Sequence, residues 1–137
     1  MEQTTRIELA NQDDLVLVRA GIKNPEDVRQ LTVKDALVDT GATGLCLPIP
    51  LIEQLGLIPL RKIQVKTANG IVERFVYSEV EYTVLERSDT IRATELSEGM
   101  PVLVGHIILK ALDLCVDIKK GLIHNPAHDG EWMIKIL

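Results

Sequence analysis

The sequence has few aromatic residues and few cysteines, and each shortage makes some classes of protein less consistent with it. Aromatics are only 3% of the 137 residues although 46% are hydrophobic, so Leu, Ile and Val fill most apolar positions, a composition that leans towards strands. Two cysteines make no disulfide framework, and neither has a second ligand at the close spacing of a zinc site. We interpret Cys46 and Cys115, which lie among apolar residues, as buried thiols, with a disulfide as the alternative.

Long apolar runs and long runs of one charge are also missing. The longest apolar stretch, 102–109, is interrupted by Gly105 and His106 and is too short to cross a bilayer. Residues 1–9 carry three charged residues and no apolar segment of the signal-peptide kind. The net charge of −5 argues against binding to a nucleic-acid backbone. We therefore expect one cytoplasmic domain, with no membrane and no nucleic-acid partner.

Short apolar runs separated by turn residues predict an all-β domain. The expected strands are 4–9, 15–20, 33–38, 45–47, 63–67, 71–77, 80–85, 91–94, 102–104, 115–118, 122–123 and 132–137. Asn69-Gly70 is a strong hairpin signal, and a polar turn at 87–89 joins the next pair of strands. Residues 51–55 favour a helical turn, and 107–114 is the clearest helix candidate because apolar residues recur there at spacings of four and three.

The segment Ala-Leu-Val-Asp-Thr-Gly-Ala-Thr, residues 36–43, is the most informative part of the chain. An apolar strand delivers the carboxylate of Asp39, and Thr40 and Gly41 follow at once. Gly41 has no Cβ, so the chain can turn sharply there, and the Thr40 hydroxyl can donate a hydrogen bond inwards. The pattern predicts an aspartate held rigidly at the end of a buried strand. The alternative is a structural aspartate at a plain strand-to-turn junction.

The Asp-Thr-Gly motif stands in a fixed order with two later elements. The hairpin at 67–71 comes next, and Leu103-Val104-Gly105 follows and leads into the predicted helix. This ordered set resembles the retropepsin-like aspartic proteases, the family of the retroviral proteases and their single-domain bacterial relatives. The resemblance implies a small, closed, antiparallel β-barrel with one short C-terminal helix. It places an N-terminal extension at 1–32, a protease core at 33–123 and a C-terminal strand segment at 124–137.

The same resemblance implies roles for individual residues. Asp39 is the catalytic carboxylate, and Thr40 and Gly41 support it, the threonine through a hydrogen-bond grip across a dimer interface. The residues implied to bind substrate are Ala42, Thr43, Ala68, Asn69, Gly70, Ile71, Leu103 and Val104, with the hairpin as a flap over bound peptide. Viral members have an ion pair between an acidic residue after the Asp-Thr-Gly-Ala segment and an arginine after the late glycine. Thr43 and His106 stand at those positions here, so that pair is absent.

The chemistry of this family calls for two neighbouring carboxylates that share one proton, and this chain has one Asp-Thr-Gly. We therefore expect a homodimeric endopeptidase that cleaves a peptide or protein substrate in apolar side-chain pockets, without a metal or other cofactor. Terminal strands at 4–9 and 132–137 are expected at the dimer interface. Two alternatives remain: a catalytically silent dimerisation or peptide-binding module with the same fold, and a dormant protease that requires removal of its N-terminal segment.

Overall fold

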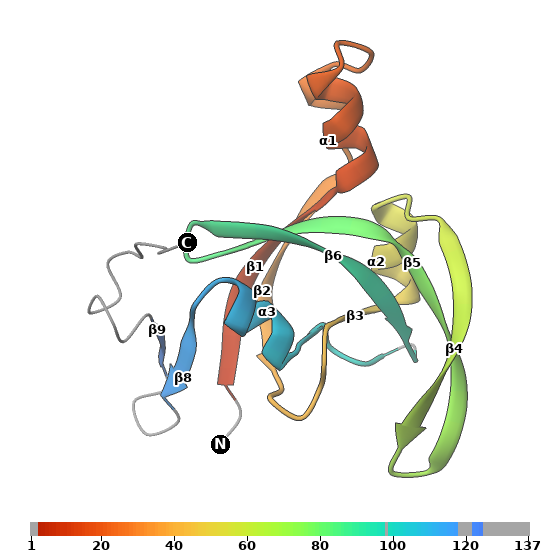
Figure 1. The fold of residues 1–137 in the computed structure, drawn as a ribbon, viewed down its shortest axis with the longest axis vertical. Helices are drawn as coiled ribbons and strands as arrows, with labels where there is room; N and C mark the ends of the chain where they lie inside the picture. Colours follow the sequence, from red (N-terminus) through yellow and green to blue (C-terminus); the bar gives the residue numbers. More distant parts are fainter. Residues whose placement is uncertain (1–2, 98, 118–121, 125–137) are drawn as a thin grey trace.

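The structure is a computed structural model that describes residues 3–97, 99–117 and 122–124. Among these residues, seven strands form one sheet in the order β1-β2-β7-β3-β6-β5-β4, and pairing of β1 with β5 closes it into a ring (Figure 1). The strands are β1 Gln3–Asn11, β2 Gln30–Val38, β3 Leu45–Pro48, β4 Pro59–Thr67, β5 Gly70–Val84, β6 Arg87–Leu96, β7 Leu103–Val104, and a separate pair, β8 Cys115–Asp117 and β9 Leu122–His124. The predicted closed, mostly antiparallel β architecture is confirmed. The strand predicted at 132–137 lies outside the described residues.

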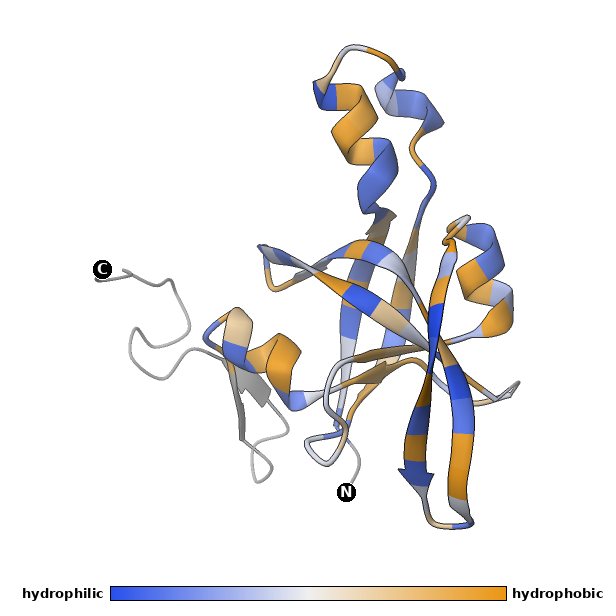
Figure 2. Cartoon of the chain, turned by 45° about the vertical axis from the view of Figure 1, so that its right-hand side comes forward, coloured by the Kyte–Doolittle hydropathy of each residue, from blue (hydrophilic) through white to orange (hydrophobic). Residues whose placement is uncertain are grey.

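The ring encloses a core of aliphatic side chains. Val80, Tyr82 and Val84 recur at every second position of β5, and each is at most 1% exposed. Leu45 and Leu47 show the same spacing in β3 and are fully buried. Side chains alternate between the two faces of a strand, so each strand turns one apolar row inward. Figure 2 shows this alternation of hydrophobic and hydrophilic positions along the β4–β5 hairpin.

Strand β1 belongs to the ring and is not an extension that precedes it. It pairs antiparallel with β2 from Gln3 opposite Val38 to Ala10 opposite Gln30, and residues 8–11 also pair with β5. The predicted division at residue 33 therefore does not match the sheet. A chain trimmed to residue 22 or 33 would lose this strand, whose Ile7 and Leu9 lie in the core.

Residues 15–20 were expected as a strand, but residues 12–19 form helix α1 (Gln12–Arg19). The Asn11 side chain caps this helix by accepting a hydrogen bond from the backbone N–H of Asp14 at 3.0 Å. Asp13 and Asp14 lie in its first turn and Arg19 in its last, as the helix dipole favours. The helix and the short 3-10 helix η1 (Pro25–Asp27) project from the barrel as an arm between β1 and β2 (Figure 1).

The Asp14 carboxylate fastens this arm to the start of β2. It is 1% exposed and accepts hydrogen bonds from Lys23 Nζ at 2.7 Å and from Arg29 Nη2 and Nε at 2.9 and 3.0 Å. The Arg29 guanidinium, helped by Lys23, holds the pKa of Asp14 far below its usual range, although burial opposes this. Asn11 Nδ2 also donates to the carbonyl oxygen of Leu55 at 2.8 Å, which joins the base of the arm to the rest of the barrel.

The predicted strands at 71–77 and 80–85 are one continuous strand, β5, and the turn after it lies at Leu85-Glu86, not at 87–89. Both turn residues have positive φ, 49° and 66°, the hand that suits the twist of a two-residue hairpin. Arg87 Nη1 donates to the carbonyl oxygen of Leu112 at 2.9 Å and so ties this turn to the end of helix α3.

The two helical segments predicted at 51–55 and 107–114 are confirmed, as α2 (Ile49–Gln54) and α3 (His106–Ala111). Helix α3 is shorter than expected, because Asp113 has a φ of 56° and ends the helical path before Leu114. With α1, the described chain therefore carries two helices besides the one near the C-terminus. None of the helices in the described ranges is both long and apolar enough to span a membrane.

Candidate active site

Asp39 follows directly after the last residue of β2. Strand β7 fixes this end of β2, because it runs parallel to it with Leu37 opposite Leu103 and Val38 opposite Val104. The backbone N–H of Asp39 donates to the carbonyl oxygen of Val104 at 3.0 Å. The other edge of β7 pairs antiparallel with β3. Asp39 thus stands at the end of a strand, as the sequence predicts, and the structure adds that β7 and β3 hold that end in place.

The loop after Asp39 folds back onto the aspartate. The N–H of Gly41 donates to Asp39 Oδ1 at 2.9 Å, and the N–H of Ala42 donates to the Asp39 carbonyl oxygen at 3.0 Å. A Cβ on Gly41 would lie 3.2 Å from the same Oδ1, so glycine lets the carboxylate rest on the loop backbone. Thr40 is exposed, and among the described residues its hydroxyl forms no hydrogen bond, so the expected inward bond is absent in the single chain.

The start of α3 holds the second half of the loop. The N–H of Gly105 donates to the carbonyl oxygen of Gly44 at 2.9 Å, and the N–H of Ile107 donates to that of Thr43 at 3.0 Å. Such N–H groups have no partner within their own helix, so the loop carbonyls satisfy them. A Cβ on Gly105 would lie 2.5 Å from the carbonyl carbon of Thr43, so this contact requires glycine.

His106 holds the loop at one of the two positions where the family resemblance led us to look for an ion pair. Its backbone N–H donates to the carbonyl oxygen of Ala42 at 3.1 Å, and its ring Nδ1 lies 2.8 Å from the same oxygen. The carbonyl has no proton to give, so Nδ1 must carry the hydrogen in this contact. A hydrogen-bond brace thus connects the helix and the Asp39 loop without an acidic partner at Thr43.

The predicted flap is the tip of the β4–β5 hairpin, which projects from the barrel (Figure 1). Thr67 pairs with Gly70, so Ala68 and Asn69 are the two turn residues, and Gly70 has a φ of 110°. Thr67 Oγ1 donates to the Gly70 carbonyl oxygen at 2.8 Å and accepts from the Asn69 N–H at 3.2 Å. Ile71 is 68% exposed. The tip is thus internally bonded and open to a ligand.

A groove of about 360 Å³ lies against this hairpin. It is lined by Cys46, Val65, Thr67, Ala68, Asn69, Val72, Arg74, Thr94, Glu95, Leu96, Ser97 and Met100. Of the predicted substrate-binding residues only Ala68 and Asn69 line it, whereas Ala42, Thr43, Leu103 and Val104 cluster around the Asp39 loop. Charged and hydroxyl side chains share this groove with apolar ones, and the apolar pockets expected beside Leu103, Val104 and Ile71 stay a prediction. No sequence motif marks those residues.

Cys46 connects the groove to the Asp39 loop. It lies opposite Leu103 in the β3–β7 pairing and also lines the groove. Burial, and then the negative charge of Asp39, raise the pKa of the Cys46 thiol. The sequence suggested a buried thiol, and the Cys46 side chain is half-buried at the wall of the groove.

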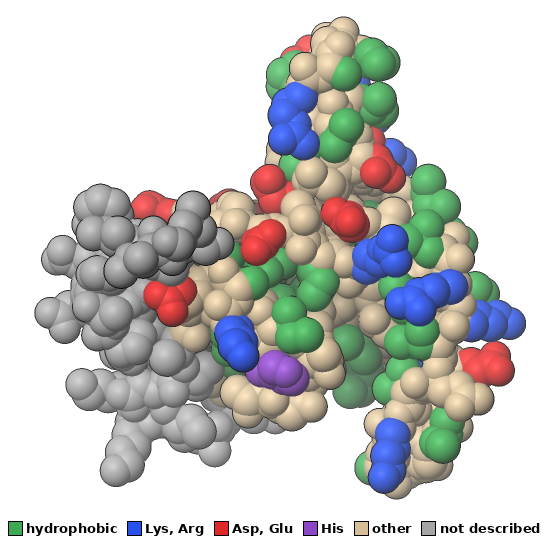
Figure 3. All heavy atoms as spheres, in the orientation of Figure 1, with side chains coloured by type: hydrophobic (Ala, Val, Ile, Leu, Met, Phe, Trp, Pro, Cys, Tyr) green, Lys and Arg blue, Asp and Glu red, His purple; other side chains and the backbone are tan. Residues whose placement is uncertain are grey.

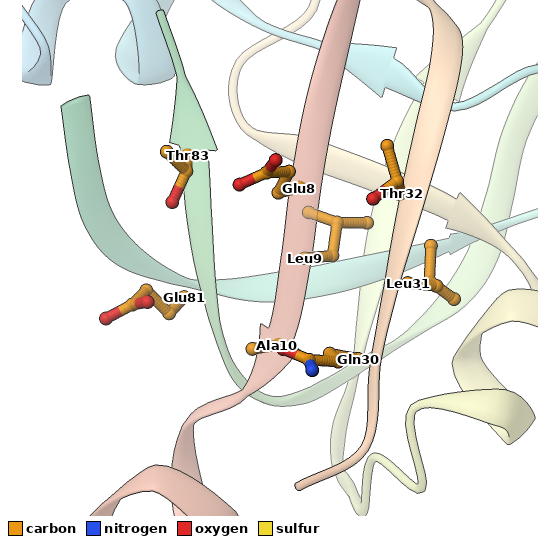
Figure 4. Close-up of a pocket in the computed structure, with 8 residues that line it drawn as sticks. All are labelled: Glu8, Leu9, Ala10, Gln30, Leu31, Thr32, Glu81 and Thr83. Carbon is orange, nitrogen blue, oxygen red and sulfur yellow. The ribbon is translucent and has the colours of Figure 1, made fainter. Parts of the chain in front are cut away.

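A second cavity, of about 430 Å³, lies between β1, β2 and β5. Figure 4 shows Glu8, Glu81, Thr32 and Thr83 around it. Thr32 precedes Asp39 by seven residues of extended strand, about 23 Å, so this cavity is separate from the Asp39 loop. Within the described part of the chain, no group of three or more His, Cys, Asp or Glu side chains is placed to hold a metal ion.

Comparison with known proteins agrees with this geometry. The sequence model of the family described as gag-polyprotein putative aspartyl protease matches residues 30–111, which include the Asp39 loop, the hairpin and the start of α3. The chain belongs to this family. The retropepsin-like resemblance noted in the sequence is thereby confirmed. The matched region begins at β2, so β1 and the α1 arm lie outside it.

Solved structures of retropepsin-like proteins share the fold. EIAV protease complexed with the inhibitor HBY-793 is 22% identical, with a TM-score of 0.53 over 82% of this chain and 88% of that chain. The retroviral protease-like domain of Ddi1 from Leishmania major is 15% identical, with a TM-score of 0.51 over 88% of this chain and 86% of that chain. No sequence among the curated proteins matches the chain. At these identities the two structures support the fold alone.

Proposed function

We propose that this chain is an aspartic endopeptidase that acts as a homodimer, with Asp39 of each protomer in one shared active site. The observation that carries the proposal is the Asp39 loop itself. Its carboxylate accepts a hydrogen bond from Gly41 at 2.9 Å, and its backbone is fastened to β7 and to the start of α3. A positioned carboxylate is what water activation requires. Membership of an aspartyl protease family supports this reading.

The proposed reaction needs two carboxylates side by side. Like charges so close do not both ionise, so the pair shares one proton. The ionised group takes a proton from a bound water, and the protonated group polarises the scissile carbonyl. The sequence has a single Asp-Thr-Gly, so the second Asp39 is supplied by a second copy across a two-fold axis. Thr40 and Gly41 are exposed in the single chain, as residues on such an interface would be.

The substrate is proposed to lie as an extended strand between the hairpin tip and the Asp39 loop. Backbone groups of Gly41 and Ala42 on one side and of the hairpin tip on the other would bond to the peptide backbone, as in recognition by strand addition. The partly buried Leu103 would form the floor beside the loop, with the fully buried Val104 packed beneath it, because their strand lies between β2 and β3. This arrangement favours unfolded or extended protein segments as substrates over compactly folded ones.

Cleavage of a complex peptide mixture tests the proposal. Wild type, Asp39→Asn and the control Asp35→Asn are compared from pH 4 to 7.5, and products are identified by mass spectrometry. Asp35 is an exposed residue of the same strand, so its substitution makes the same charge change away from the loop. Cuts that persist in Asp35→Asn and vanish in Asp39→Asn are expected. Cuts that persist in Asp39→Asn would exclude Asp39 as the catalytic group.

Sedimentation under the assay conditions tests the dimer. Activity is expected to rise with the square of the protein concentration below the dissociation constant, because only the dimer holds two copies of Asp39. A monomer that cleaves at undiminished specific activity would overturn the shared active site, while leaving the peptidase activity itself intact.

A further inference from the structure

The groove against the hairpin carries an arginine, Arg74, that has no carboxylate partner among the described residues. Arg74 Nη2 donates to Ser97 Oγ at 3.0 Å, and Nη1 donates to the carbonyl oxygen of Glu73 at 3.0 Å. Both acceptors are neutral groups. Among the described residues no carboxylate lies within ion-pair distance of Arg74. A guanidinium has five N–H donors, so further donors remain for a ligand.

Side chains alternate between the two faces of strand β5, and this alternation places Arg74 on the face that borders the groove. Val72 and Val76 share its face of the strand, and Val76 is buried in the barrel wall at 6% exposed. Val72 and Arg74 both line the groove. An arginine in this row is unusual, because the other side chains of the row from Val72 to Val84 carry no charge. Its long side chain therefore brings a cation to a place where a peptide under the hairpin would lie.

Glu95 lies in the same groove, but its carboxylate is engaged elsewhere. Oε1 accepts from the backbone N–H of Phe75 at 2.9 Å, and Oε2 lies 3.4 Å from the Tyr77 hydroxyl. Burial, and after it the charge of Glu95, raise the pKa of Tyr77, which therefore stays a hydrogen-bond donor. These donors satisfy Glu95 without Arg74. Among the described residues, the groove thus presents one cation with open donors and one carboxylate that already accepts a hydrogen bond at each oxygen.

We propose that this groove binds an acidic side chain of the peptide substrate, and that Arg74 is the residue that selects it. The inference deepens the proposed peptidase function and rests on it for cleavage, but the binding preference is separately measurable. A carboxylate matches the planar fork of a guanidinium and can accept two parallel hydrogen bonds from it. The small side chains of Thr94 and Cys46 line the same groove. Its volume of about 360 Å³ is large enough for an Asp or Glu side chain.

Two peptide-library measurements test the inference. In the first, wild type cleaves a library in which each position is fixed in turn as Glu, Gln, Lys or Leu. In the second, the Asp39→Asn protein binds fluorescent members of the same library, read by anisotropy. We expect one position to favour Glu over Gln on the order of tenfold in both measurements. Arg74→Gln should remove that preference, and Arg74→Glu should shift it to Lys.

Arg61→Gln is the matched control, since Arg61 is an exposed arginine of the same hairpin that does not line the groove. It should keep the preference for Glu, and circular dichroism should show native spectra for all variants. Cleavage with no acidic preference, or a preference that survives in Arg74→Gln, overturns the inference and leaves the peptidase function standing. Acid-selective binding without any cleavage supports the inference and overturns the peptidase function. Absence of both binding and cleavage overturns both.

Discussion

Replacing Asp14 by asparagine tests how the α1 arm is held to the barrel. Removing one partner of a fully buried ion pair destabilises a protein by about 3–5 kcal/mol, because the other charge stays buried. The side chains of Arg29 and Lys23 are 48% and 25% exposed, so both cations can be hydrated once the carboxylate is gone. Asparagine also keeps one acceptor oxygen. We therefore expect the free energy of unfolding to fall by about 2 kcal/mol at pH 7.

The same variant makes a prediction about pH. Arg29 lowers the pKa of Asp14 in the folded state, whereas the unfolded chain has the ordinary value of about 4. Stability from this carboxylate is therefore complete above about pH 4 and is lost as the pH falls towards the folded-state value. The difference between wild type and Asp14→Asn should shrink between pH 7 and pH 3.

Urea denaturation at a fixed protein concentration, followed by circular dichroism at both pH values, measures this difference. Asp13→Asn, an exposed neighbour in the same helical turn, is the control and should change stability by less than about 0.5 kcal/mol. The reasoning is refuted if Asp14→Asn matches that control at pH 7. It is also refuted if the loss is as large at pH 3 as at pH 7.

Three other predictions concern the core and the active-site loop. Gly105→Ala places a Cβ 2.5 Å from a backbone carbonyl carbon of the Asp39 loop. The free energy of unfolding, measured by urea denaturation, should therefore fall by about 2 kcal/mol, and the rate of peptide cleavage should drop sharply. An unchanged free energy of unfolding would contradict the close contact. Leu45→Ala removes a fully buried side chain and should cost about 3 kcal/mol by the same assay, with a loss below 1 kcal/mol as the contrary result. The raised pKa of Cys46 predicts that iodoacetamide alkylates this thiol more slowly at pH 8 than it alkylates a free cysteine, measured in a protein with Cys115 replaced by serine. Asp39→Asn should speed the alkylation of Cys46. An unchanged rate would argue against the proximity of Asp39 and Cys46.

The barrel and the Asp39 loop were predictable because their signals are local. An apolar run, an aspartate, a small hydroxyl residue and a glycine stand together in the sequence, and the β4–β5 hairpin has its Asn-Gly signal. The positions of these elements in the sheet followed from the resemblance to a known family. The brace from His106 to Ala42 had no such signal, because those residues lie 64 positions apart.

The α1 arm and the second hairpin turn were mispredicted for a physical reason. Residues 15–18 are Leu-Val-Leu-Val, whose intrinsic preference is for a strand. The helix is instead favoured by the Asn11 cap and by the contact of Asp14 with Arg29, 15 residues away. Leu85-Glu86 likewise adopts two positive φ values without glycine or asparagine. Tertiary contacts override local preference in both cases.

Ring closure leaves β4 as the terminal strand of the seven-stranded sheet in the described part of the chain. An unpaired strand edge invites pairing with another chain, which is a route to aggregation. Pro59 opens this strand and removes one donor, and Arg61, Lys62 and Lys66 are exposed along it. Figure 3 shows Lys and Arg side chains gathered over this hairpin. We expect these positive charges to disfavour pairing of the β4 edge with another copy, and high salt, which screens the charges, should weaken that effect.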